Sequence, residues 1–152
     1  MEYGSISREI HIEATPEVVY QVISRPEHLR EWWPDEAELE APVPGGTGTV
    51  SFGSGPDTKV ELLTVVEADP PRRFAFRWVC EEGESAGPGN SLLVTFDLVP
   101  TGNGTLLRFS EAGFREKGWE AAVLEEAYQE HVRGWDYFLP RLVGYAAEVA
   151  TR

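Results

Sequence analysis

The chain has almost no cysteine and no long apolar run. Its 152 residues include one cysteine, Cys80, which excludes an internal disulfide and a cysteine-based metal cluster. No run of about 18 apolar residues is present, so no transmembrane helix is expected. The segment Met1 to Ser5 lacks the basic and apolar regions of a signal peptide. We therefore expect a cytoplasmic protein that does not insert into membranes, with Cys80 as a small buried hydrophobic residue.

Positive charge is also scarce. The chain has 13 Lys and Arg residues and 26 Asp and Glu residues, which gives a formal net charge of −13. Such a surface repels phosphate backbones and anionic lipids, so nucleic-acid and membrane partners are not expected, and solubility explains the acidity most simply. The chain has no phosphate loop, serine nucleophile elbow or dinucleotide fingerprint, and its three histidines lack the spacing of a zinc site. We predict no metal and no cofactor.

Aromatic residues are plentiful and patterned. A hydrophobic fraction of 41% with 11% aromatics suits a single globular domain over residues 1–152. The turn Asp69 to Arg72 contains two prolines and leads into a strand in which Phe74, Phe76, Trp78 and Cys80 alternate with other residues. Period two places these side chains on one face of a sheet. Three rings on one short strand require a large apolar partner or a cavity.

The elements follow one another in a clear order. A strand over Ser7–Ala14 is followed by two short helices, Pro16–Ser24 with Thr15 as its cap and Pro26–Trp33. The remaining expected strands, separated by Gly- and Pro-rich turns, are Ala37–Pro42, Gly48–Gly53, Thr58–Ala68, Arg72–Cys80, Asn90–Val99 and Thr105–Glu111. A long helix over Trp119–Val149 closes the chain, with a kink or break expected near Pro140.

This order predicts an α+β fold. About six to seven strands form a curved antiparallel sheet, which wraps around the long C-terminal helix because no other element can cover its apolar face. The helix has an apolar stripe of Leu124, Tyr128, His131, Trp135, Phe138, Leu139 and Leu142.

The chain resembles the START/birch-pollen-allergen superfamily, also called SRPBCC, which has the helix-grip fold. Within it, the chain is most similar to the activator of heat-shock protein ATPase homologue branch. The resemblance is carried by Ile10 to Tyr20, Trp32-Trp33-Pro34, Asp69 to Phe74, Gly113-Phe114, His131 to Trp135, Leu139 and Leu142. It implies a cavity between sheet and helix that holds an apolar small molecule, but it does not imply one activity, because relatives include carriers, cyclases and chaperone co-factors.

Glu111 and His131 are the candidate catalytic residues. Glu111 follows Leu107 and Phe109 by period two and should point to the inner face, where an unpaired carboxylate is costly. It either reaches water at the strand end or pairs with His131, as an acid and base at the cavity floor. His131 is either a core histidine or a polar anchor for a ligand.

Rings on the inner face are candidates for ligand contact, although packing in the core explains them equally well. At least one of Trp32 and Trp33 should be partly exposed, because neighbours on a helix face different ways. The candidate ligand-binding residues are Trp32, Trp33, Phe76, Trp78, Phe96, Phe109, Glu111, Tyr128, His131 and Trp135.

Three functions remain open. The first is binding of a small hydrophobic or aromatic molecule, and the second is a cofactor-free polyketide cyclase or hydratase using Glu111, His131 and Tyr128. The third is a protein-interaction module. Apolar residues expected on the outer face could support a homodimer: Leu63, Val65, Val79, Leu93 and Leu106.

Overall fold

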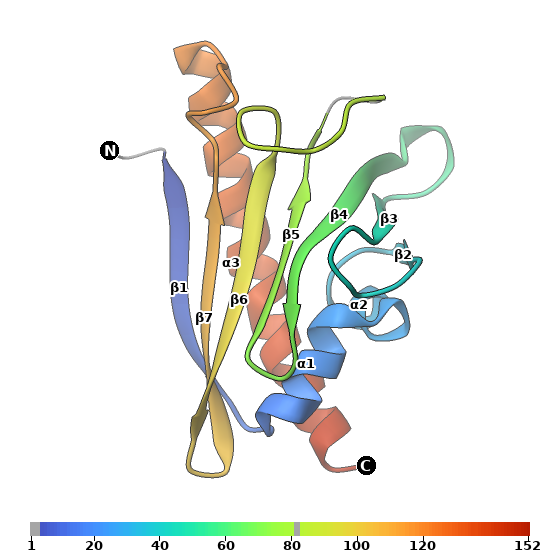
Figure 1. The fold of residues 1–152 in the computed structure, drawn as a ribbon, viewed down its shortest axis with the longest axis vertical. Helices are drawn as coiled ribbons and strands as arrows, with labels where there is room; N and C mark the ends of the chain where they lie inside the picture. Colours follow the sequence, from blue (N-terminus) through green and yellow to red (C-terminus); the bar gives the residue numbers. More distant parts are fainter. Residues whose placement is uncertain (1–3, 81–82) are drawn as a thin grey trace.

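Seven strands form one antiparallel sheet in the computed structural model, which describes residues 4–80 and 83–152. The strand order is β1-β7-β6-β5-β4-β3-β2, so a meander from β2 to β7 is completed by the first strand (Figure 1). The bounds are β1 Ser5–Ile12, β2 Glu36–Leu39, β3 Thr47–Phe52, β4 Lys59–Asp69, β5 Arg73–Trp78, β6 Leu92–Thr101 and β7 Gly104–Ala112. The predicted α+β class and helix-grip architecture are confirmed.

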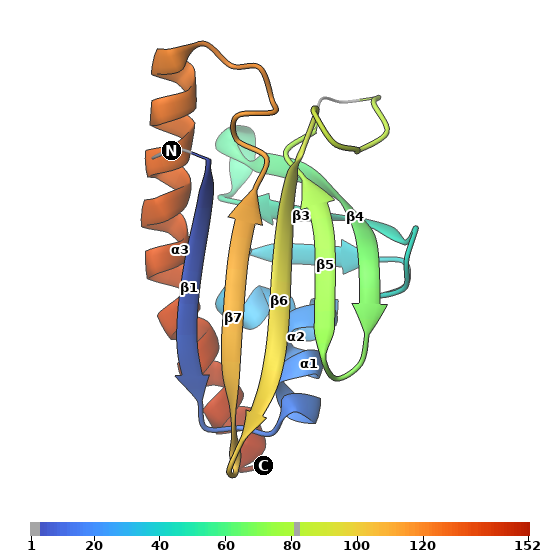
Figure 2. The ribbon, with the colours of Figure 1, turned by 60° about the vertical axis from the view of Figure 1, so that its left-hand side comes forward.

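Two short helices follow the first strand, and one long helix closes the chain. They are α1 Pro16–Ser24, α2 Pro26–Trp32 and α3 Ala121–Ala150, with a 3₁₀ turn at Gly55–Asp57 between β3 and β4. Figure 2 shows α3 running along one face of the sheet, with β2 and β3 lying crosswise to β6 and β7. The face that packs against α3 is called the inner face below.

Local sequence signals explain where the helices begin. The Thr15 hydroxyl accepts a hydrogen bond from the Val18 backbone N–H at 3.4 Å, and Pro16 occupies the first turn of α1. Pro26 begins α2 in the same way. These two helices cover one end of the inner face, where Trp32 is buried.

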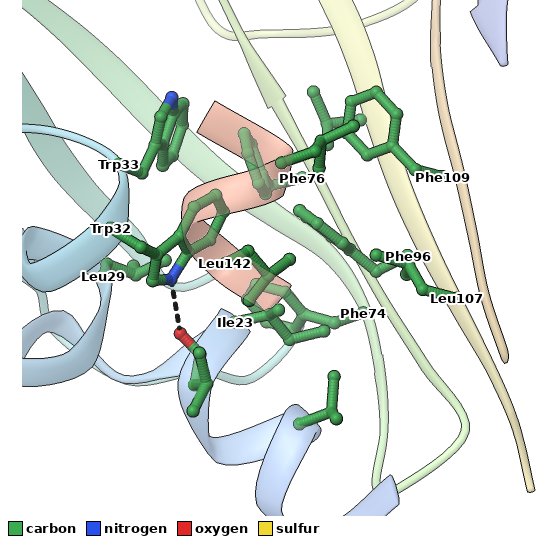
Figure 3. Close-up of a cluster of buried hydrophobic side chains, with 14 of the residues drawn as sticks. Ile23, Leu29, Trp32, Trp33, Phe74, Phe76, Phe96, Leu107, Phe109 and Leu142 are labelled. Atoms are coloured by element: carbon green, nitrogen blue, oxygen red, sulfur yellow. Dashed lines mark hydrogen bonds between the residues drawn. The ribbon is translucent and has the colours of Figure 1, made fainter. Parts of the chain in front are cut away.

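The core is formed where the inner face meets α3. Phe74, Phe76 and Phe96 are each about 1% exposed, and Phe109 packs on Trp135 with ring centroids 4.6 Å apart. Further along α3, Leu139, Leu142 and Ala146 are buried. Figure 3 shows Phe74, Phe76, Phe96 and Phe109 of the strands gathered around Leu142 of α3. The predicted pairing of the aromatic strand with the helix around Trp135 is therefore correct.

Of the kink or break expected near Pro140, the break is wrong, because α3 runs as one helix through that residue. Pro140 is exposed, so its ring meets solvent. The only backbone bond that its missing N–H removes is the one to Asp136, and packing of Trp135, Leu139 and Leu142 on the sheet holds both halves of the helix.

The expected outward direction of Leu63 and Val65 is also wrong. Leu63 pairs with Trp78 and Val65 with Phe76, and directly paired residues share a face, so both point inward and are buried. The outer face of β4 instead carries Val60, Leu62 and Val66, which are 60%, 44% and 45% exposed. Leu93 and Leu106, half-buried, alternate with buried neighbours and do lie on the outer face.

Candidate functional site

A pocket of about 300 Å³ lies between α3 and the β3–β5 side of the sheet. Its wall contains five aromatic rings, from Trp33, Phe52, Trp78, Trp135 and Phe138. The rings form one cluster, with Trp33 stacked on Trp135 at 5.3 Å and 5.0 Å from Trp78. The remaining lining residues are Lys59, Glu61, Val79, Glu130, His131 and Gly134. The volume is at the lower end of the range for small-molecule sites.

Glu111 lies directly behind this wall and is fully buried. Its Oε2 accepts the indole N–H of Trp78 at 2.7 Å, and its Oε1 accepts the indole N–H of Trp135 at 2.8 Å. His131 Nδ1 is 2.8 Å from the same Oε1. Three side chains of the pocket wall are therefore held by one carboxylate. Its burial excludes the alternative that Glu111 sits at a strand end open to water.

The secondary structure explains why these groups meet. Glu111 pairs with Val94 of β6 on the inner face of β7, and Phe109, two residues earlier, points the same way. His131 and Trp135 are one helical turn apart on α3, so both face β7 and β5. The Glu111–His131 contact was one of the two alternatives that the sequence left open, whereas the two indole donors were not predicted.

His131 is the polar side chain that connects the network to the pocket. Its side chain is 16% exposed, and its ring packs edge-to-face on Trp78 and Phe114. Within residues 4–80 and 83–152, Nε2 of His131 has no hydrogen-bond partner, and it is not among the buried polar atoms that lack one. This nitrogen is therefore accessible, on a residue that lines the pocket.

The rim of the pocket carries charge. Lys59 of β4 lies 3.8 Å from Glu130 of α3, and both side chains are more than half exposed. An exposed pair at this distance contributes about 0–1 kcal/mol, so it can open at little cost. Glu61 adds a second carboxylate to the lining.

The structure brings four of the predicted ligand-binding residues into the pocket wall: Trp33, Trp78, His131 and Trp135. Glu111 lies behind them. Trp32, Phe76, Phe96 and Phe109 are buried in the core instead, where the Trp32 indole donates to the Val22 carbonyl (Figure 3). Tyr128 is not part of the wall, because its hydroxyl donates to the Ser5 carbonyl at 2.9 Å and its ring packs on Phe114.

Both Trp32 and Trp33 are buried, at 0% and 5% exposure, so the prediction that one would be partly exposed is wrong. Helical spacing does not hold at this point, because α2 ends at Trp32 and Trp33 leaves the helix with φ −117° and ψ −92°. The change of direction turns the Trp33 ring onto Phe76 and Trp78.

The end of β5 departs from the predicted alternation as well. β5 ends at Trp78, and Val79 has φ 58°, a conformation that a β-branched residue rarely adopts. Val79 therefore lines the pocket and does not lie on the outer face, and Cys80 is half-buried instead of buried in the core. The Lys117 ammonium donates to the Val79 carbonyl at 2.9 Å and fixes this turn.

Several lining residues were missed by sequence reasoning: Phe52, Lys59, Glu61, Glu130 and Gly134. Gly134 could have been predicted from the sequence, because a glycine inside a helix costs stability and often marks a place where space is needed. A Cβ built at Gly134 meets nothing within 4 Å. Phe138 belongs to the predicted apolar stripe but was not assigned to the site.

Among the described residues, no group of three or more His, Cys, Asp or Glu side chains could hold a metal ion. Nor does that part of the chain contain a helix long and apolar enough to cross a bilayer.

A curved antiparallel sheet closed by a long C-terminal helix, with an aromatic pocket between the two, defines a helix-grip protein. The family model of Activator of Hsp90 ATPase homolog 1-like proteins matches residues 13–147, and the chain belongs to this family. No curated protein matches the chain.

Solved structures share the fold at low sequence identity. Protein MLL2253 from Mesorhizobium loti is 22% identical, with a TM-score of 0.74 over 93% of this chain and 95% of that one. The Aha1 dimer from Colwellia psychrerythraea is 21% identical, with a TM-score of 0.67 over 91% and 92%. CalU16 from Micromonospora echinospora is 22% identical, with a TM-score of 0.68 over 93% of this chain and 65% of that protein.

Proposed function

We propose that this protein binds a small hydrophobic or aromatic molecule in the pocket between α3 and the sheet. The observation that carries the proposal is the pocket wall itself, in which five aromatic rings surround about 300 Å³ of space. Glu111 takes up the indole N–H groups of Trp78 and Trp135, so these two tryptophans present apolar ring surface to an occupant. A largely apolar pocket with one or two polar groups is typical of small-molecule sites.

Filling the pocket from α3 tests this proposal. Gly134 lines the pocket and Gly144 does not, although both lie inside α3 and a Cβ at either position meets nothing within 4 Å. Gly134→Leu should therefore occupy the pocket without disturbing the fold, and Gly144→Leu is its matched control.

Binding of naphthalene, measured by saturation-transfer NMR, should fall at least about tenfold in Gly134→Leu, because a leucine side chain would occupy the space of the ligand. It should be unchanged in Gly144→Leu. Native mass spectrometry of the gently purified protein would show in addition whether a cellular ligand is carried along. Absence of naphthalene binding in the unaltered protein, or equal binding in both variants, would refute the proposal.

A cofactor-free enzyme, such as a polyketide cyclase or hydratase, is the second candidate. The observation that favours it is the contact of Glu111 with His131, because a carboxylate that orients a histidine is a common arrangement for proton transfer. If proton transfer at His131 drives such a reaction, His131→Phe should lower turnover about 10²- to 10⁴-fold with binding retained. Unchanged turnover would exclude this role.

We also propose that the outer face of β4 forms a homodimer contact. Val60, Leu62 and Val66 are large, exposed and on the outer face of one strand, and a related structure, that from Colwellia, is described as a dimer. Light scattering across micromolar concentrations should show a dimer that Leu62→Glu dissociates. Val123→Glu, which places the charge on an equally exposed site of α3, should leave it intact. A monomer at all concentrations would refute the contact.

A further inference from the structure

The hydrogen bonds around Glu111 fix which nitrogen of His131 carries its proton. An indole N–H can only donate, so Trp78 and Trp135 use both carboxylate oxygens as acceptors. His131 Nδ1 lies 2.8 Å from Oε1, which also accepts the Trp135 N–H, and a carboxylate oxygen can accept a second donor. Nδ1 of the neutral imidazole is therefore the protonated nitrogen, and Nε2 is an acceptor.

That acceptor is available to an occupant of the pocket. Nε2 is accessible, it has no partner among the described residues, and its residue lines the pocket beside Trp78. The indole N–H groups of Trp78 and Trp135 are already used. A molecule lying against these rings therefore meets a hydrogen-bond acceptor on the same wall. A ligand with a matching donor gains more than one with a bare ring, because a buried acceptor left unsatisfied is costly.

The charges around the pocket disfavour anions. Glu61 and Glu130 line it, and the buried Glu111 lies directly behind it. Of the lining residues that the structure describes, Lys59 is the one lysine or arginine. Lys59 is paired with Glu130 at the rim. Three carboxylates against one ammonium leave a negative balance, and low-dielectric walls strengthen its effect on a bound charge.

We propose that the occupant is a neutral aromatic molecule with a hydroxyl group, of the phenol class, whose O–H donates to Nε2 of His131. The proposal rests on the proposed binding function and narrows its ligand. The rings of the wall hold the aromatic skeleton, His131 selects the hydroxyl group, and Glu111 acts as a positioning residue that holds the proton on Nδ1 and so leaves Nε2 as the acceptor of the neutral ring.

Four bicyclic probes of similar size test the proposal: 2-naphthol, 2-methylnaphthalene, 2-methoxynaphthalene and 2-naphthoate. The first can donate a hydrogen bond, the second can neither donate nor accept, the third can only accept, and the fourth is an anion. At neutral pH, 2-naphthol should bind about tenfold more tightly than the methyl and methoxy compounds, the worth of one net hydrogen bond. The naphthoate should bind most weakly.

The outcomes distinguish a failure of the hydroxyl preference from a failure of the binding function. If all the neutral probes bind equally, or if the methoxy compound matches 2-naphthol, the hydroxyl preference is refuted while the binding function stands. If none of the neutral probes binds, the binding function itself fails. In His131→Phe the ratio of the 2-naphthol affinity to the 2-methylnaphthalene affinity should fall to about one.

A second measurement does not depend on a variant that could misfold. The ¹⁵N chemical shifts of the His131 ring in the unaltered protein distinguish a protonated from an unprotonated nitrogen. The proposal requires a protonated Nδ1 and an unprotonated Nε2 at neutral pH, with the Nε2 signal shifting when 2-naphthol is added. A protonated Nε2 in the free protein would overturn the proposal.

Discussion

At the scale of single residues, Glu111 is the centre of the site although no ligand could touch it. A carboxylate without solvent contact is expensive unless its oxygens are fully used, and here Trp78, Trp135 and His131 use them. The same three bonds fix two ring planes and one imidazole. Pocket shape and stability therefore depend on one side chain.

Replacing Glu111 with glutamine should destabilise the fold, because an amide has one acceptor oxygen and its NH₂ group would face a donor. At least one of the three donors would lose its partner, at a cost of about 1–3 kcal/mol in the free energy of unfolding. Urea denaturation measures this loss. Glu9→Gln, which removes the charge from the exposed contact with Arg108, should cost less than about 1 kcal/mol. Equal effects of the two substitutions would contradict this view of Glu111.

Tyr20 of α1 presents a second buried polar atom. Its hydroxyl is buried without a hydrogen-bond partner in the described residues, and its ring packs edge-to-face on Phe74. Burial, aided by the negative charge of Asp69, raises the pKa of Tyr20 from 10.0 to about 12. The folded state therefore favours the protonated phenol. This contribution to stability is complete below pH 10 and is lost as the pH rises toward 12.

Tyr20→Phe should accordingly be at least as stable as the unaltered protein at pH 7, because it removes an unsatisfied hydroxyl. Between pH 10 and 12 the variant should gain a further advantage of up to about 2 kcal/mol, since only the unaltered chain can ionise residue 20 on unfolding. Denaturant unfolding at a series of pH values measures the difference. A difference that does not change with pH would show that Tyr20 titrates normally.

The residue pairs of the site could be predicted only in part. Period two along β7 and the helical stripe of α3 were enough to suggest a Glu111–His131 pair as one of two alternatives. Nothing in these patterns shows the distance between α3 and each strand, so Phe52 and Glu61 of the wall were missed. The direction of Trp33 depends on how the chain leaves α2, which no periodicity describes.

At the scale of elements, α3 combines regularity with a weak point. Pro140 sits inside the helix on its exposed side, and the carbonyl of Asp136 lacks the usual partner there. The Asp136 carboxylate is held by Arg8 of β1 through bonds of 2.9 and 3.2 Å, which tie this part of α3 to the sheet.

Pro140→Ala should therefore stabilise the protein by about 1–3 kcal/mol, because it restores one helical hydrogen bond and removes a steric clash. Thermal unfolding followed by circular dichroism measures the effect. Gly144→Ala, one turn further on, gives a reference of about 1 kcal/mol for better helix propensity alone. A stability loss in Pro140→Ala would mean that the proline's stiffening of the unfolded chain outweighs both gains.

The positions of the strands could be predicted from the sequence, but the inward-facing side of β4 could not. All seven strands were predicted at nearly the right places, because prolines and glycines separate them. In β4, however, apolar residues occupy both faces, including Val60, Leu62, Leu63 and Val65, so alternation alone could not give the inward set. The pairing of Leu63 with Trp78 and of Val65 with Phe76 places these two residues on the inner face. A bulge between Val65 and Glu67 then shifts the alternation of inward and outward residues.

At the scale of the whole molecule, charge is the dominant surface property. A net charge of −13 on 152 residues opposes compaction through self-repulsion. We expect the melting temperature to rise as sodium chloride increases from about 10 to 200 mM, because screening acts on the summed repulsion more than on the few exposed ion pairs. Sucrose at matched osmolality serves as the uncharged control. A melting temperature that falls with salt would contradict this expectation.

The strand order also has a consequence for synthesis on the ribosome. β1 is made first, yet its partner in the sheet is β7, with Ile10 opposite Leu107, about 100 residues later in the chain. The inner face of the sheet then remains without its cover until α3 has left the exit tunnel. A nascent chain stalled before residue 121 should therefore present an unpaired edge and a bare aromatic surface, which are the features that chaperones bind.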